Sequence, residues 1–236
     1  MDFGEIFGDA LKYPFNNIKA LLIYIVLGII LGIAVSGTAM GVAAGAAAQN
    51  AFAVIASGIV GIVVALFLGF LIAGFQLDII KYGINRDAGS PGIDPVRQFF
   101  NGVKLLIVNI IYYIIPIVIS FILGLIFQHW LSTLINIILF VIFTLAAFMG
   151  ECRLAKTESL GNALAIGEAI GDISKIGILK LIAFIICTFI IAFILYFIVG
   201  MVMQANATIG GILLGILGVY ISFFIARATG LLYSDV

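Results

Sequence analysis

Charged residues are scarce in this chain and missing from most of its length. They make up 9% of the sequence, whereas hydrophobic residues make up 64%. In an ordinary soluble domain roughly a quarter of the residues are charged. A chain with so little polar surface cannot cover a water-exposed fold. The composition therefore excludes an ordinary soluble protein and predicts a chain whose solvent is lipid.

Residues that carry chemistry are equally scarce. The sequence has one histidine, His129, and two cysteines, Cys152 and Cys187, which lie in different predicted segments without metal-ligand spacing. It has no phosphate-binding glycine loop and no nucleic-acid motif. We therefore expect no enzyme, no catalytic residue, no metal, no cofactor and no nucleic-acid partner.

Long apolar runs dominate what is present. About 20 apolar residues are enough for an α-helix to cross a hydrocarbon core of roughly 30 Å. The predicted spans are near residues 20–42, 52–76, 105–126, 131–150, 178–202 and 208–226. These runs are apolar on every face, unlike the alternating strands of a membrane β-barrel. The sequence predicts an all-α, polytopic integral membrane protein with six transmembrane helices in a single membrane domain, 1–236.

The basic residues indicate how the chain is oriented. All 11 Lys and Arg lie at or beyond the ends of the apolar runs, on one side of them. Because loops rich in Lys and Arg stay in the cytoplasm, both termini are predicted to be cytoplasmic. Asp2, Glu5 and Asp9 precede the first run and argue against a secretory leader, which begins with basic residues. We therefore expect a multi-pass protein of the cell membrane.

A short amphipathic segment and a lysine precede each pair of spans. The sequence can thus be divided into three units of an interfacial helix plus a transmembrane hairpin, at about 1–76, 77–150 and 151–236. In the second unit, Asp94 and Pro95 are typical of a helix start. The segments either contact the membrane surface or only connect one hairpin to the next. The predicted interfacial anchors are Phe3, Phe7, Lys19, Phe99, Phe100, Lys104, Trp130 and Lys180.

Stripes of small residues mark the first, second and sixth spans. Small residues at every fourth position allow helix backbones to approach closely in lipid. The predicted helix-packing or oligomer residues are Gly28, Gly32, Gly37, Gly41, Gly45, Ser57, Gly61, Ala65, Gly69, Ala73, Gly211, Gly215 and Gly218. These stripes can pack helices within one subunit or between subunits. The first interpretation predicts a tight core of spans one, two and six.

No ionisable residue lies near the middle of a predicted span. Proton relays and ion-coupled transporters place such groups at depth, so these functions are disfavoured. We expect a non-catalytic membrane protein with a structural, assembly or membrane-organising role. Its expected partners are membrane lipid and a second copy or another membrane protein. The alternative is a channel or carrier for a small or apolar solute, which predicts a continuous cavity between spans one, two and six.

Short motifs resemble a known family. They are Asp9-Ala10-Leu11-Lys12-Tyr13-Pro14 before the first span, Gly74-Phe75 closing the second, Lys81 and Arg86 after it, and Phe99, Gly102 and Lys104 before the third. This arrangement resembles the archaeal membrane family known as domain of unknown function 4013. The resemblance implies an archaeal source, a methanogen, and six or so spans. It implies no assigned activity and no site residues.

Overall fold

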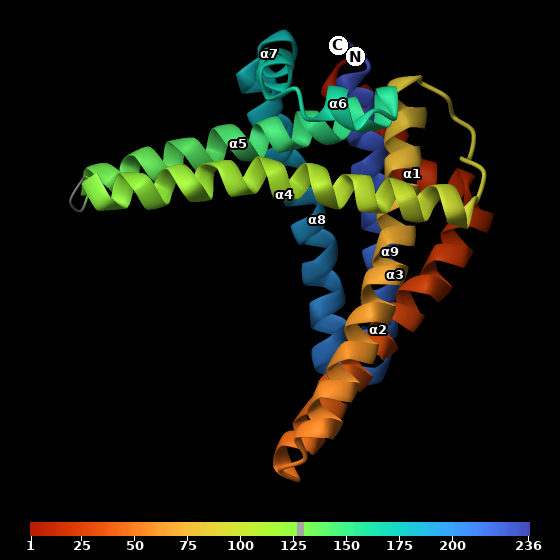
Figure 1. Ribbon diagram of the computed structural model, residues 1–236. Coiled ribbons are helices and arrows are strands. Elements are labelled where there is room, and N and C mark those ends of the chain that lie inside the picture. Colours follow the sequence, from red (N-terminus) through yellow and green to blue (C-terminus); the bar gives the residue numbers. More distant parts are fainter. Residues whose placement is uncertain (127–129) are drawn as a thin grey trace.

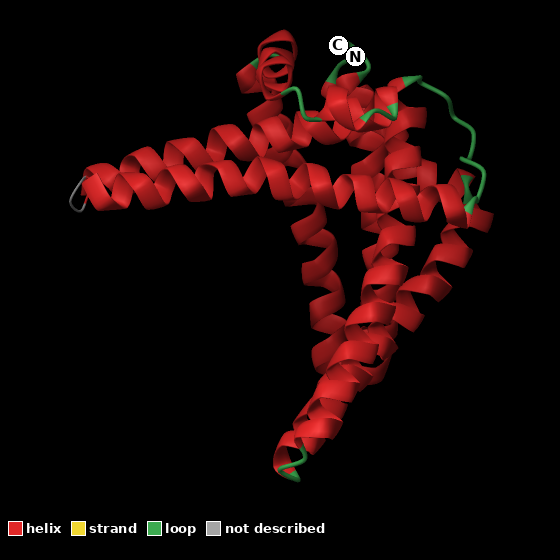
Figure 2. Cartoon of the chain, viewed as in Figure 1, coloured by secondary structure: helices red, strands yellow, loops and turns green. Residues whose placement is uncertain are grey.

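The computed structural model describes residues 1–126 and 130–236, with the side chains of 36, 126, 207, 208, 211 and 212 left out. Within these ranges the chain is helical and has no strand (Figure 2). The helices are α1 (Phe3–Asn16), α2 (Ile18–Ala47), α3 (Ala51–Ile84), α4 (Pro95–Ile126), α5 (Trp130–Thr157), α6 (Leu160–Ala163), α7 (Ile166–Ile176), α8 (Ile178–Ala205) and α9 (Ala207–Tyr233). The predicted all-α class is confirmed.

Six helices are long and apolar enough to cross a membrane, and they are the six that the apolar runs predict: α2, α3, α4, α5, α8 and α9. The fold is therefore compatible with a multi-pass membrane protein. The second amphipathic segment, however, is not a helix of its own. The Arg97 N–H donates to Asp94 Oδ1 at 3.1 Å, which fixes the start of α4, and the helix then passes Lys104 without a break. Segment and span form one helix, which Gly102 does not break.

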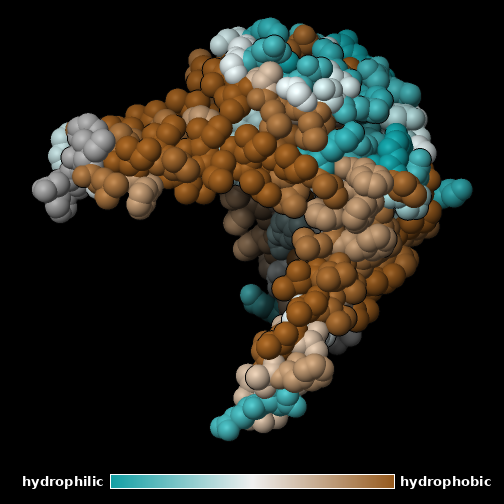
Figure 3. Space-filling view, in the orientation of Figure 1, coloured by the Kyte–Doolittle hydropathy of each residue, from teal (hydrophilic) through white to brown (hydrophobic). Residues whose placement is uncertain are grey.

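The helices leave a common junction in two directions (Figure 1). α2, α3, α8 and α9 run one way, whereas the α4–α5 hairpin diverges from them, and both chain termini lie at the junction. Most of the hydrophilic surface in this view gathers at the junction, whereas hydrophobic residues cover most of both sets of helices (Figure 3). We call the junction the polar cap. It consists of α1, residues 85–94, α6, α7 and the adjoining ends of the long helices. We call the part of the α4–α5 hairpin that projects from it, described over residues 113–126 and 130–142, the α4–α5 arm.

Small residues bring α2, α3 and α9 together, which is the set of spans that the stripes predict. A methyl group added at Gly61 would overlap Thr38 of α2, and one added at Gly41 would lie 2.9 Å from Ser57 Cβ of α3. Gly28 approaches Val219 of α9. Real Cβ atoms do not approach as closely as those at Gly61 and Gly41 would, whereas at Gly28 Val219 would have to shift only slightly.

The remaining predicted packing residues are less uniform. A methyl group at Gly45 would lie 2.9 Å from the Val54 backbone N, and one at Gly218 would lie 3.9 Å from Tyr196 Oη. Ser57, Ala65 and Ala73 are half-buried. By contrast, a methyl group would meet nothing within 4 Å at Gly32, Gly37, Gly69 or Gly215. The surroundings of Gly211 are not among the described parts of the chain, and neither is His129.

Two further glycine crossings were not among the predicted packing residues. Where α3 crosses α4, a methyl group at Gly74 would overlap the Gln98 carbonyl, and one at Gly102 would overlap the Phe70 carbonyl. Where α3 crosses α9, Gly83 and Gly230 face each other, and a methyl group at Gly83 would lie 2.9 Å from Gly230 Cα. α3 is therefore the helix to which both directions of the fold are joined.

Candidate functional site: the polar cap

The polar cap holds the buried polar side chains with the most partners. Three clusters, centred on Asp78, Arg153 and Arg227, each join helices that are far apart in the sequence. Burying a charge is costly unless it is paired and hydrogen-bonded. The buried charges of each cluster therefore need partners.

The Asp78 cluster joins α2, α3 and α4. Arg97 Nη2 donates to Asp78 Oδ2 at 2.9 Å, and Gln98 Nε2 donates to the same oxygen at 3.3 Å. Tyr24 Oη of α2 donates to Gln98 Oε1 at 2.7 Å. Asp78, Gln98 and Tyr24 are each at most 2% exposed. A chain of hydrogen bonds therefore ties three long helices together beside the Gly74–Gly102 crossing.

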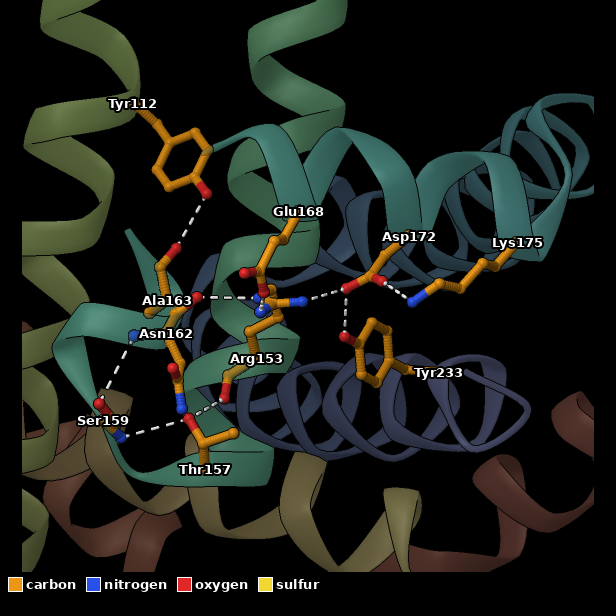
Figure 4. Close-up of polar contacts among 10 residues, drawn as sticks. All are labelled: Tyr112, Arg153, Thr157, Ser159, Asn162, Ala163, Glu168, Asp172, Lys175 and Tyr233. Atoms are coloured by element: carbon orange, nitrogen blue, oxygen red, sulfur yellow. Dashed lines mark hydrogen bonds and ion pairs between the residues drawn. The ribbon is translucent and has the colours of Figure 1, made fainter. Parts of the chain in front are cut away.

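The Arg153 cluster joins α5, α6, α7 and α9 (Figure 4). Arg153 Nη1 donates to Asp172 Oδ2 at 2.9 Å, and its Nε donates to the Asn162 carbonyl at 2.8 Å. Arg153 also pairs with Glu168. Tyr233 Oη donates to Asp172 Oδ2 at 2.6 Å. The planar guanidinium has donors in several directions, so one arginine can hold three elements at once.

Asp172 is the buried acceptor at the centre of this cluster. Its side chain is 1% exposed, and it also accepts a hydrogen bond from Lys175 Nζ at 2.7 Å. Burial alone would raise the pKa of this carboxyl, but hydrogen bonds from Lys175, Tyr233 and Arg153 outweigh burial and lower the pKa below its ordinary value. The carboxyl is therefore ionised at neutral pH.

The Arg227 cluster fastens α1 to α9. Arg227 is 1% exposed, and its Nε donates to Asp9 Oδ1 at 2.6 Å. It also donates to the Asp87 carbonyl, and its guanidinium carbon lies 4.8 Å from the centre of the Tyr13 ring. A single buried arginine thus holds α1 and the linker of residues 85–94 on the end of α9.

Some charged neighbours in the sequence are not partners in the structure, although Asp172 and Lys175 are. Asp78 pairs with Arg97 rather than with Lys81, and Lys81 Nζ instead pairs with Glu158 Oε1 at 2.6 Å. The hydrogen bond from Lys81 lowers the pKa of Glu158. Glu151 accepts from Asn109 Nδ2 at 2.8 Å, across α4 and α5. Local spacing could not reveal these pairs, because each of them joins different helices.

The predicted anchors fall into two groups. Phe3 and Phe7 pack inward on the core, where the Phe7 ring stacks on Phe184 of α8 with centroids 5.5 Å apart. Phe99 also packs inward, against Phe67 and Phe70 of α3.

The other anchors lie at the surface or in the cap. Phe100 and Trp130 are exposed, at 59% and 75%. Lys104 Nζ donates to the Glu158 carbonyl at 3.2 Å, and Lys180 lies 3.6 Å from Asp235 Oδ2. Lys19 is exposed. Anchoring to a membrane surface stays a prediction for these residues.

The polar groups of the cap connect helices to one another. Asp78 and Asp172 each accept at least two hydrogen bonds, and Glu151 accepts one from the Asn109 amide. The arginines of the three clusters donate to carboxylates and backbone carbonyls. Among the described residues no group of three His, Cys, Asp or Glu is placed to hold a metal ion. Cys152 is buried and Cys187 half-buried, both as free thiols. The arrangement suits rigid attachment of the two sets of helices.

Comparison with known proteins gives one match. Residues 58–204, more than half of the chain, match the family described as protein of unknown function (DUF4013). No curated protein and no solved structure matches the chain. The matched region begins in α3, includes the whole α4–α5 hairpin and the Asp78 and Arg153 clusters except Tyr24 and Tyr233, and ends in α8. The chain therefore belongs to the DUF4013 family of proteins of unknown function.

Proposed function

We propose that this protein is a non-catalytic assembly component of the membrane. In this proposal the polar cap holds the α4–α5 arm away from the other helices so that the arm packs against a second copy or another membrane protein. The observation that carries the proposal is the divergence of the α4–α5 arm from the other long helices (Figure 1), which leaves large apolar side chains of the arm exposed.

Side chains along the arm support this role. Large apolar residues are exposed around both helices, among them Phe121 at 69% and Leu125 at 74%. Ser120 Oγ and Asn136 Oδ1 are buried in the arm and make no hydrogen bond with any described residue. In lipid, helices associate through close packing and polar contacts rather than through apolarity alone. These two atoms are enclosed within the arm, so the support for a protein neighbour comes from the exposed apolar side chains.

The proposal places the polar cap in the cytoplasm, with both termini, and the apolar helices in the cell membrane. The gathering of all 11 Lys and Arg at the ends of the spans supports this orientation. At 1.5 Å per residue, α2 and α3 are about 45–50 Å long, well beyond a hydrocarbon core of roughly 30 Å. Strong tilts of the two sets of helices, in opposite directions, accommodate both this length and their divergence.

Two finer features remain proposals. The three-unit plan is supported by α1 before the α2–α3 hairpin and α7 before the α8–α9 hairpin, whereas the second unit has no separate helix before α4. An archaeal, methanogen source rests on the resemblance of the motifs alone.

The assembly role is tested by photo-cross-linking in native membranes. A photoreactive phenylalanine analogue replaces Phe121 in the arm or, as the matched control, Phe52 at the tip of the α2–α3 hairpin, which is 81% exposed. We expect protein adducts from position 121, with a mass that shows whether the neighbour is a second copy, and lipid adducts from position 52. Lipid adducts alone from both positions would contradict the proposal.

The alternative, a channel or carrier, is tested separately. Purified protein in liposomes is assayed for flux of small neutral and charged solutes. The assembly role predicts no specific flux above empty liposomes. A specific, saturable rate would overturn it in favour of transport.

A further inference from the structure

A cleft of about 530 Å³ opens at the edge of the polar cap, beside the Asp78 cluster, whose Arg97 and Gln98 donate to the carbonyl of the lining residue Gly92. Its walls are two chain segments, residues 16–20 at the junction of α1 and α2, and residues 90–93 of the linker before α4. The lining residues include Lys19, Ser90 and Asn16, alongside Ile18 and Ile93. Polar and apolar side chains thus share one concave surface.

Lys19 differs from most basic residues of the chain. Nine of the 11 Lys and Arg have a carboxylate, carbonyl or aromatic partner, and among the described residues only Lys12 and Lys19 have none. Lys19 lines the cleft and Lys12 does not. An ammonium without a counter-ion in a cleft attracts an anion.

The first turn of α2 adds hydrogen-bond donors beside Lys19. Asn17 does not cap this turn, because its Nδ2 donates back to the Tyr13 carbonyl at 2.9 Å. The backbone N–H groups of residues 18–20 therefore have no side-chain acceptor, and these three residues line the cleft. A phosphate group accepts hydrogen bonds from ammonium, hydroxyl and backbone N–H donors together.

The surroundings favour a lipid over a free anion. Phe15, Ile18 and Ile93 are exposed, at 65%, 58% and 40%, beside the polar lining. Immediately after Lys19, α2 continues as an unbroken apolar span. In a membrane-inserted chain this boundary between charged and apolar residues lies at the depth of the lipid headgroups.

We propose that this cleft binds the phosphate headgroup of a membrane lipid, with Lys19 as the main electrostatic contact and Ser90 and the first turn of α2 as hydrogen-bond donors. The apolar residues at its rim contact the acyl chains. This site is independent of the assembly role, because the cleft is formed by α1, α2 and the linker and not by the α4–α5 arm.

The test measures lipid retention by native mass spectrometry of the full chain in detergent micelles. Phosphatidylglycerol is titrated against diacylglycerol with the same acyl chains, which lacks the phosphate. We expect one phosphatidylglycerol to be retained in preference to diacylglycerol, and Lys19→Gln to weaken its retention by about tenfold. Equal retention of the two lipids by the unaltered protein would overturn the proposal.

Two matched variants separate this site from general effects of charge. Lys12→Gln removes the other unpartnered lysine and is expected to leave retention within twofold of the unaltered protein; an equal loss in both variants would contradict the site. Gly92→Val fills the cleft without removing a charge, since a methyl group there meets nothing within 4 Å, and is expected to weaken retention as Lys19→Gln does. Unchanged retention in Gly92→Val would overturn the location.

The last arm separates the two sources of phosphate. Inorganic phosphate is added to the retained lipid at the same concentration as phosphatidylglycerol and then at 100 times that concentration. A lipid site is expected to keep its lipid, because the acyl chains add contacts that the free ion lacks. Displacement at equal concentration would instead identify a site for a free anion.

Discussion

The α2–α3 hairpin and the α4–α5 hairpin are made of helices of similar length, 30 and 34 residues against 32 and 28, yet they are packed very differently. Close contacts between α2 and α3 extend from Gly61 and Thr38 to Gly45 and Val54 near the tip, and α9 lies alongside. Among the described residues, the contacts that attach the α4–α5 hairpin near its base include the Gly74–Gly102 crossing and the Asp78 and Arg153 clusters.

This difference shows what holds helices together when the solvent is apolar. Apolar surface is abundant on both hairpins, but it gives little drive for association, since acyl chains are as apolar as leucine. Helices stay together where glycine admits a backbone or where buried polar groups pair. The α4–α5 arm diverges from the other long helices (Figure 1), and in the proposed assembly its exposed apolar surface is the part that a partner covers.

The largest expected effect comes from the base of the arm. Gly74→Ala places a methyl group against the Gln98 carbonyl, which belongs to a helix backbone and cannot rotate away. We expect a loss of about 3 kcal/mol in the free energy of unfolding, measured by denaturant titration in micelles. Gly69→Ala, on the same helix and in open space, is the control and is expected to be neutral or slightly stabilising. Equal stability of the two variants would contradict the crossing.

The next effect concerns the ionised carboxyl that ties α7 to α5 and α9. Asp172→Asn removes the charge that accepts from Arg153, Lys175 and Tyr233, and is expected to cost about 2 kcal/mol at neutral pH. Glu168→Gln alters the exposed partner of Arg153, which is 66% exposed, and is expected to cost less than about 0.5 kcal/mol. A similar cost for both variants would show that burial of Asp172 does not matter.

The same carboxyl predicts a pH dependence. Because the pKa of Asp172 is lower in the folded state than in the unfolded state, its contribution is present above the unfolded value of about 4 and is lost as the pH falls through the folded value. The unaltered protein should lose stability in this acidic range more steeply than Asp172→Asn, in unfolding titrations at stepwise lower pH. Parallel curves for the two proteins would exclude this role.

A smaller effect is expected within the α2–α3 hairpin. Gly61→Ala meets the Thr38 side chain rather than a backbone, so the expected cost is about 1–2 kcal/mol. The double variant Gly61→Ala, Thr38→Ala should recover most of it, since Thr38 donates only within its own helix, to the Ala34 carbonyl. Purely additive costs would mean that the two residues do not contact each other.

The smallest effect on stability is expected on the arm itself. Leu125→Ala truncates a side chain that is 74% exposed and should change the free energy of unfolding of the isolated chain by less than about 0.5 kcal/mol. The same change should weaken association in the membrane, seen as a loss of cross-links from position 121. A large loss of stability without loss of cross-links would reverse the assignment of this surface.

The sequence predicted the helices of the fold better than the contacts that hold them together. Runs of about 20 apolar residues were sufficient to identify six long helices, because length and apolarity are local properties. The stripes in spans one, two and six pointed to α2, α3 and α9. Gly74, Gly83, Gly102 and Gly230 were missed as packing residues, because each is significant only through the helix that crosses it. Gly74 and Gly102 do stand among the family motifs, which was the one available signal.

The sequence predicted where the charged residues of the polar cap lie, but it did not predict which of them form ion pairs. The sequence puts the charges at one end of the spans, but Asp78 with Arg97, Arg153 with Asp172 and Arg227 with Asp9 are separated by 19, 19 and 218 residues. No local pattern links them. The amphipathic segments were likewise recognised by their periodicity, whereas the inward packing of Phe7 on Phe184 depends on where α8 lies.

The most direct test of the assembly role is the mass of the protein extracted gently in its native lipids, with any partner that accompanies it identified. The account predicts a particle that holds two or more protein subunits, and a smaller particle for a variant with Phe121 and Leu125 both changed to Ala. A single 25.2 kDa chain surrounded only by lipid, unchanged by these substitutions, would contradict the claim that the α4–α5 arm is an interface.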